Sequence, residues 1–264
     1  MKNTLFKPGL VSISFRELSN GQIVDLVSEA GLLGIEWGGD VHVPHGEVAV
    51  AERARQSTID AGLEVSAYGS YYRFDECFED SNEKGPEFEA VLDSAEALKA
   101  PSIRVWAGRQ GSEEISKADR RRVIERAREI GASAEKRGIR VDFEFHDHSL
   151  TDTNEATGKL LDDIGHPNVG TFWQTKLCVG HEYRLEGLKA LIDRITNIHC
   201  NFFGEDAWPN AHLISDGASD WADYLRVLNN SSNERWLTIE HVKGNEVESF
   251  KRDAETLKQW LSRS

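Results

Sequence analysis

Eight short apolar segments, separated by stretches with helical periodicity, are the feature that most constrains how this chain can fold. Most of the segments are rich in β-branched or aromatic residues, as buried strands are. Between them lie segments with apolar residues at steps of three and four, so strand and helix alternate along the chain. The predicted strands are Leu10–Ser14, Gly34–Trp37, Leu63–Tyr68, Ser102–Trp106, Val141–Phe145, Val169–Trp173, Ile195–Cys200 and Trp236–Glu240.

The intervening segments read as helices, and the pattern is clearest in residues 19–31, 115–138 and 248–261. Ser19 is the expected N-cap of the first helix, which ends at Gly31. The alternation continues without a composition break or a Pro/Gly/Ser-rich linker, which indicates one parallel α/β domain. Eight units of roughly 30 residues fit a (β/α)8 TIM barrel better than an open sheet. We therefore predict a single barrel domain over residues 1–264.

The amino-acid composition limits the kinds of partner that such a domain is expected to bind. The chain has 31 Lys and Arg against 45 Asp and Glu, a formal net charge of −14, so a nucleic-acid partner is not expected. Three cysteines without a C-x-x-C motif predict a reduced, cytoplasmic protein rather than a disulfide framework. A signal-like N-terminus and an apolar run of about 18 residues are both missing, so no membrane partner is expected.

Polar side chains gather where the predicted strands end. The carboxyl ends of barrel strands meet at one rim, which is where active sites of such barrels lie. Glu144, His199 and Glu240 lie at the ends of the fifth, seventh and eighth strands, and Gln174 follows the sixth. Carboxylate, amide and imidazole groups form a mixed oxygen and nitrogen set that suits Mn²⁺, Mg²⁺, Co²⁺ or Zn²⁺. The sequence therefore predicts a divalent-metal site at this rim.

Each of these residue types also has a plainer interpretation. A single histidine on an apolar strand, such as His199, is more often a hydrogen-bonded core residue than a ligand. A buried glutamate needs an arginine, a lysine or a metal, because an unpaired buried carboxylate is costly. The tryptophans at strand ends could be packing residues or the walls of a sugar-sized pocket; they are Trp37, Trp106 and Trp173.

The order and spacing of several segments resemble the xylose isomerase-like TIM barrels, the sugar phosphate isomerase/epimerase family. Those segments are VSISF, GIEWGGDVHVP, AGLEVSAYGSYY, FEFH, PNVGTFWQ, NIHCNF and TIEHV, and they cover nearly the whole chain. The resemblance implies one divalent metal, with manganese favoured, bound by Glu144, Gln174, His199 and Glu240. Gln174 stands where the family usually has Asp, and Leu177 stands where many members have His. A neutral amide at residue 174 predicts weaker or altered metal binding.

The resemblance further implies a metal-dependent isomerase or epimerase of a sugar, a sugar phosphate or a related keto-polyol. Glu144 and Glu240 would move the proton next to a carbonyl while the metal stabilises an enediolate. One alternative is a metal-dependent lyase or dehydratase, either inosose-dehydratase-like or keto-glycoside-cleaving, with His146 or His241 as the acid for the leaving group. The other is a catalytically decayed sugar-binding subunit, which Gln174 suggests.

The expected partner is a small carbohydrate, and the chain could form a homodimer, as related barrels often do. The residues expected to contact the substrate are Trp37, His42, Tyr68, Arg104, Trp106, His146 and Trp173.

Overall fold

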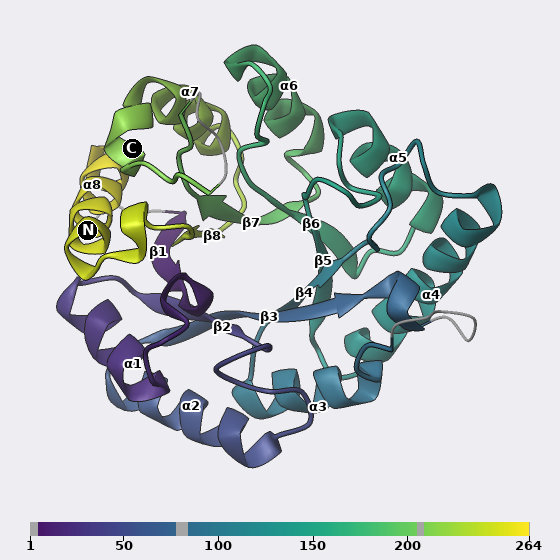
Figure 1. Ribbon diagram of the computed structural model, residues 1–264, viewed down its shortest axis with the longest axis horizontal. Helices are drawn as coiled ribbons and strands as arrows, with labels where there is room; N and C mark the ends of the chain where they lie inside the picture. Colours follow the sequence, from purple (N-terminus) through teal and green to yellow (C-terminus); the bar gives the residue numbers. More distant parts are fainter. Residues whose placement is uncertain (1–4, 78–83, 205–208, 264) are drawn as a thin grey trace.

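The computed structural model describes residues 5–77, 84–204 and 209–263, and within them eight parallel strands close into a barrel in sequence order. The helices form a ring around the strands, as Figure 1 shows in the view down the barrel. The predicted (β/α)8 barrel is therefore confirmed. The strands are β1 (Phe6–Val11), β2 (Gly34–Gly38), β3 (Glu64–Arg73), β4 (Ser102–Trp106), β5 (Arg140–Glu144), β6 (Val169–Trp173), β7 (Ile195–Cys200) and β8 (Arg235–Ile239). The helices are α1 (Asn20–Glu29), α2 (Val48–Asp60), α3 (Phe88–Leu98), α4 (Lys117–Glu135), α5 (Asn154–Ile164), α6 (His181–Leu191), α7 (Ala218–Asn229) and α8 (Val247–Arg263).

Local capping explains why the predicted helices begin where they do. The Ser19 hydroxyl accepts from the Gln22 amide, and the Gln22 side chain accepts from the Ser19 amide, which forms a capping box at the start of α1. Ser116 caps α4 in a similar way by accepting from the Asp119 amide. Beyond the end of α1, Gly31 has a φ of +67°, a conformation that glycine adopts without steric cost.

Two predicted strands were placed wrongly at their ends. β1 runs over Phe6–Val11, whereas the prediction was Leu10–Ser14, because Ser12–Phe15 forms a 3₁₀ turn. The Ser12 hydroxyl accepts from the Gly38 amide at 2.9 Å, which holds this turn against the end of β2. β3 continues to Arg73, five residues beyond the predicted end, and its pairing with β4 shifts register after Gly69.

Successive side chains of a strand point to opposite faces, so the barrel interior and the helix-facing layer receive alternate residues. In β2, Glu36 is bonded to the Arg104 guanidinium inside the barrel, whereas the neighbouring Trp37 indole donates to the Thr58 hydroxyl of α2. Helix-borne aromatic residues such as Trp221 and Phe250 complete the outer core. In the part of the chain that is described, none of the helices has the length and apolar character that a bilayer crossing needs.

Candidate metal centre

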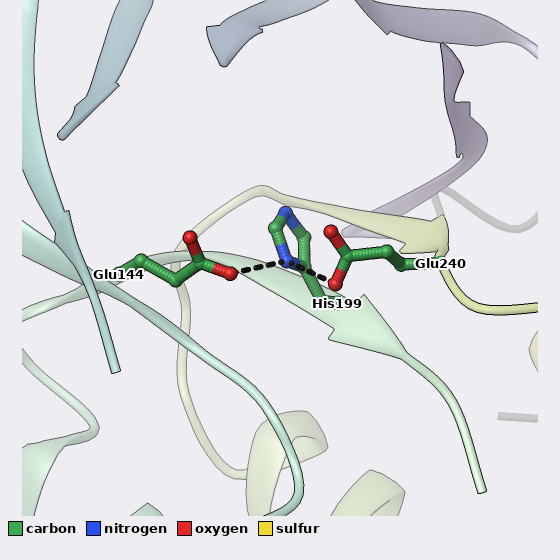
Figure 2. Close-up of side chains that lie close together, drawn as sticks. All are labelled: Glu144, His199 and Glu240. Atoms are coloured by element: carbon green, nitrogen blue, oxygen red, sulfur yellow. Dashed lines mark ion pairs between the residues drawn. The ribbon is translucent and has the colours of Figure 1, made fainter. Parts of the chain in front are cut away.

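Glu144, His199 and Glu240 converge inside the barrel at its carboxyl-terminal end (Figure 2). Glu144 is the last residue of β5, His199 lies in β7, and Glu240 directly follows β8. His199 Nδ1 is 3.7 Å from Glu144 Oε1 and 3.0 Å from Glu240 Oε2, so the two carboxylates flank this one ring nitrogen (Figure 2). All three side chains are buried, so their charges are removed from water and must be balanced locally.

The other ring nitrogen of His199 is held by Glu36. Nε2 lies 3.0 Å from Glu36 Oε2, and both side chains are completely buried. A carboxylate in this position accepts the Nε2 proton, orients the ring and increases the electron density at Nδ1. The arrangement therefore directs Nδ1 towards Glu144 and Glu240.

Arg104 supplies the permanent positive charge of this network. Its Nε donates to Glu36 Oε1 at 2.7 Å, and its Nη1 donates to Glu144 Oε2. Burial alone would raise the pKa of Glu144, but Arg104 and His199 outweigh burial and lower that pKa to about 2. Both Glu144 and Glu240 are thus anionic at neutral pH, since His199 and His241 lower the pKa of Glu240 in spite of its burial.

The charge of His199 follows from the same contacts. Burial favours the neutral ring, but Glu240, Glu36 and Glu144 together raise the pKa of His199 well above its ordinary value. The negative charge of the three carboxylates is therefore larger than the single positive charge of Arg104 can balance. A proton on His199 or a divalent cation beside it would supply further positive charge.

Two unsatisfied atoms test whether a cation fits here. His199 Nδ1 and Glu240 Oε2 are buried, and neither has a hydrogen-bond partner of normal geometry among the described residues. Such atoms are rare in folded proteins because each has lost its hydration without replacement. They lie close to one another and to a carboxylate oxygen of Glu144, and together these atoms form a mixed oxygen and nitrogen donor set. The residues present therefore fit a divalent cation.

Gln174, the fourth predicted ligand, has a different orientation. Its Nε2 donates to Glu144 Oε1 at 3.1 Å and to the Phe145 carbonyl at 2.8 Å. The amide nitrogen, and not the oxygen, is thus directed at Glu144. Gln174 lies at the site, but the structure does not bring its oxygen into the cluster as the prediction required.

A cavity of about 870 Å³ opens above the cluster, and its wall includes Glu144, Glu240 and Gln174. Three of the predicted substrate residues line it, namely Arg104, Trp106 and His146. The rings of Trp106 and His146 lie 4.1 Å apart, and the Arg73 guanidinium covers Trp106 at 3.8 Å. This side of the cavity is therefore an aromatic wall backed by the Arg73 cation.

The other four predicted substrate residues lie outside the cavity, so for them the prediction of a contact there does not hold. Trp37 and Trp173 are on the helix-facing side of their strands. There the ring centroids of Trp173 and Tyr224 of α7 lie 5.1 Å apart. The Tyr68 hydroxyl donates to the Val43 carbonyl, and His42 is bonded to the Ser12 hydroxyl and the Leu18 carbonyl. Each of the four has packing partners in the shell around the barrel.

Two further residues lie at the cavity: Tyr71, which was not predicted as a site residue, and His241, which was predicted only as a possible acid for the leaving group in the lyase alternative. Tyr71 lines the cavity, and its hydroxyl accepts from Arg16 Nη2 at 3.1 Å. His241 Nε2 lies 3.4 Å from Glu240 Oε2. Both residues have a positive φ, which is costly for a side chain larger than glycine and tends to persist at functional sites. Among the described residues, four of the six such non-glycine positions line the cavity; they are Tyr71, His148, His241 and Asn245.

Comparison with known proteins agrees with this architecture. A family model described as the xylose isomerase-like TIM barrel matches residues 24–260. A 3-dehydroshikimate dehydratase of Bacillus anthracis is 33% identical over 171 residues, which are 62% of this chain and 59% of the relative. The chain thus matches less than two thirds of that relative's length.

Solved structures show the same fold. The probable 3-DHS dehydratase AsbF of Bacillus anthracis superposes with a TM-score of 0.77 at 21% identity, covering 96% of this chain and 98% of that one. A D-allulose 3-epimerase from Methylomonas sp. gives 0.72 at 14% identity, covering 97% and 98%. With the family model matching most of its length, the chain belongs to the xylose isomerase-like TIM barrel family.

Proposed function

We propose that this protein is a metal-dependent dehydratase of a small polyhydroxylated ketone. The observation that carries the proposal is an imidazole beside the paired carboxylates: His241 Nε2 lies 3.4 Å from Glu240 Oε2, and its side chain lines the cavity. His146 lines the same cavity from the end of β5. Dehydration needs an acid for the departing hydroxyl in addition to a base for the carbon, and imidazole is suited to that task near neutral pH.

Each residue of the site has a separate role in the proposed reaction. Glu144, His199 and Glu240 would hold the metal, which supplies Lewis-acid polarisation of the substrate carbonyl. Glu144 or Glu240, both anionic, accepts the proton from the carbon next to the carbonyl. The electron pair left on that carbon forms a carbon–carbon double bond as the neighbouring carbon–oxygen bond breaks. His241 protonates the departing hydroxyl, which leaves as water, so no oxidant or reductant is required.

The similarity to a 3-dehydroshikimate dehydratase supplies the first substrate to test. Purified protein would be incubated with 3-dehydroshikimate and Mn²⁺, and the conjugated product followed by ultraviolet absorbance and proton NMR. His241→Gln is expected to lower the dehydration rate about 100-fold, because an acid catalyst contributes on that scale. The same variant should still exchange the substrate's acidic proton in D₂O, since Glu144 and Glu240 are intact.

Three results would count against this proposal. They are an absence of product with 3-dehydroshikimate and with other cyclic hydroxyketones, product formation without metal, or full activity in His241→Gln. Tight metal binding with no turnover of any such compound would favour a sugar-binding subunit instead.

A second candidate is an epimerase of a keto-sugar. It is favoured by the presence of two anionic carboxylates, Glu144 and Glu240, at one site, since inversion at carbon uses two bases. The two reactions differ in D₂O: an epimerase places deuterium on the inverted carbon and releases no water. Screening ketoses by NMR alongside 3-dehydroshikimate therefore separates the candidates.

A further inference from the structure

Gln174 was predicted to be a metal ligand, but its side-chain contacts are not those of a ligand. The side chain follows β6 and reaches across to the end of β5. There its Nε2 donates to Glu144 Oε1 at 3.1 Å and to the Phe145 carbonyl at 2.8 Å. Both contacts use the same nitrogen, so the amide is anchored at two points of one strand end.

The chemistry of the two acceptors fixes which way the amide faces. Exchanging the nitrogen and oxygen would put Gln174 Oε1 against a carbonyl oxygen at 2.8 Å and a carboxylate oxygen at 3.1 Å. Neither of those groups can donate a hydrogen bond, because a backbone carbonyl and an ionised carboxylate only accept. The reversed amide would therefore replace two attractive contacts with two repulsive ones.

Glu144 is thereby held from two sides. Arg104 Nη1 donates to Oε2, and Gln174 Nε2 donates to Oε1. This leaves the carboxylate oriented with Oε1 3.7 Å from His199 Nδ1, the unsatisfied nitrogen that faces the cluster. An oriented ligand binds a cation better than a freely rotating one, because less conformational freedom is lost on binding.

We propose that Gln174 is a positioning residue that orients Glu144 through its amide nitrogen and takes no place in the metal's ligand shell. The second half of this proposal, that Gln174 is not a metal ligand, rests on the proposed metal-dependent function. The protein ligands are then Glu144, His199 and Glu240 alone, and more coordination positions are open to water and substrate than four protein ligands would leave.

The first half, that the Gln174 amide nitrogen orients Glu144, can be tested on the metal-free protein. In ¹⁵N-labelled wild type, the Gln174 side-chain amide is assigned by the signals that disappear in Gln174→Met. We expect two well-separated proton signals that exchange slowly with water, because the amide is anchored to Glu144 and Phe145. Signals like those of a freely rotating glutamine would overturn the proposal, whether or not the protein binds any metal.

The second half is tested by water-proton relaxivity of the Mn²⁺-loaded protein, which reports the number of water molecules on the ion. Gln174→Met removes both hydrogen bonds at nearly the same side-chain length. We expect its Kd for Mn²⁺ to increase about tenfold, since a hydrogen bond to a charged group is lost, while the relaxivity per bound ion stays unchanged. An increase equal to one additional bound water would show that Gln174 is a ligand and refute the proposal.

Thr175→Val is the matched control. Thr175 lines the same cavity and its hydroxyl donates to Asn201, not to Glu144, so its loss should change the Kd less than twofold. If Gln174→Met does not fold, Gln174→Leu and the metal-free amide measurement still decide the question. Failure of the dehydratase proposal would appear in the substrate assays, and it would leave the orientation of Gln174 unchanged.

Discussion

Replacing Asp142 with asparagine should stabilise the folded protein at neutral pH. Asp142 lies in the middle of β5 and is fully buried in the barrel. Neither carboxylate oxygen has a hydrogen-bond partner of normal geometry within the described residues, and Arg140 Nη2 is 3.6 Å away. Burial raises the pKa of Asp142 to about 6 from its usual 3.8, although Arg140 opposes the shift.

The size of the effect follows from this difference in pKa. Below pH 4 both the folded and the unfolded chain carry the proton, and Asp142 costs the fold no ionisation energy. Between pH 4 and pH 6 the unfolded chain releases the proton while the folded protein retains it, so stability is lost as the pH rises. About 2 pKa units correspond to about 3 kcal/mol of lost stability above pH 6.

Asparagine has nearly the same shape and does not ionise, so Asp142→Asn should recover this energy. The free energy of unfolding at pH 7.5 should increase by up to about 3 kcal/mol, which is roughly 6 to 10 °C in Tm for a chain of this size. At pH 4 the difference should nearly vanish. Urea unfolding followed by circular dichroism at both pH values measures it directly.

A suitable control is Asp25→Asn, which changes an exposed carboxylate on α1 and should alter stability by less than about 0.5 kcal/mol. Equal or lower stability of Asp142→Asn at pH 7.5 would refute the reasoning. So would a stabilisation of the same size at pH 4, because it could not come from ionisation.

Two further substitutions test the two sides of the barrel wall. Glu36→Gln should weaken Mn²⁺ binding about 10- to 100-fold, because it weakens the contact that orients His199. Calorimetric titration measures this affinity. An unchanged affinity would contradict the role assigned to Glu36. Trp37→Phe should lower the free energy of unfolding by about 1 to 2 kcal/mol through loss of the bond to Thr58 and of packing volume, yet leave the Mn²⁺ affinity unchanged. A large loss of metal affinity in Trp37→Phe would mean that this residue acts at the site after all.

The fold was predictable because a buried parallel strand has a strong local signature. β4, β6 and β7 have the predicted bounds, and in each strand most residues are apolar or β-branched. The start of the barrel was predicted less well because LVSIS has the same composition as a strand. Its last residues turn instead, and they do so through Ser12 contacts with Gly38 and His42, which are distant in sequence.

The site was predictable where strand position alone decides it. Glu144 and His146 are two residues apart and both line the cavity, as predicted, although Phe145 between them lines it too because β5 ends at Glu144 and strict alternation ends with it. The same rule applied strictly would have excluded Trp37, which is adjacent to the inward-facing Glu36. The aromatic character of Trp37 suggested a pocket wall, but its position in the strand placed it on the helix-facing side.

Contacts across the barrel interior could not be read from strand order. Glu36 and His199 lie on β2 and β7, which are not neighbours in the sheet, and they are 163 residues apart in sequence. Arg104 on β4 joins Glu36 to Glu144 on β5, so one polar network connects strands from opposite parts of the ring. Its members meet only when the barrel has closed. The orientation of His199 Nδ1 towards the two carboxylates is therefore a property of the closed barrel, and no single strand–helix unit can form the candidate metal centre.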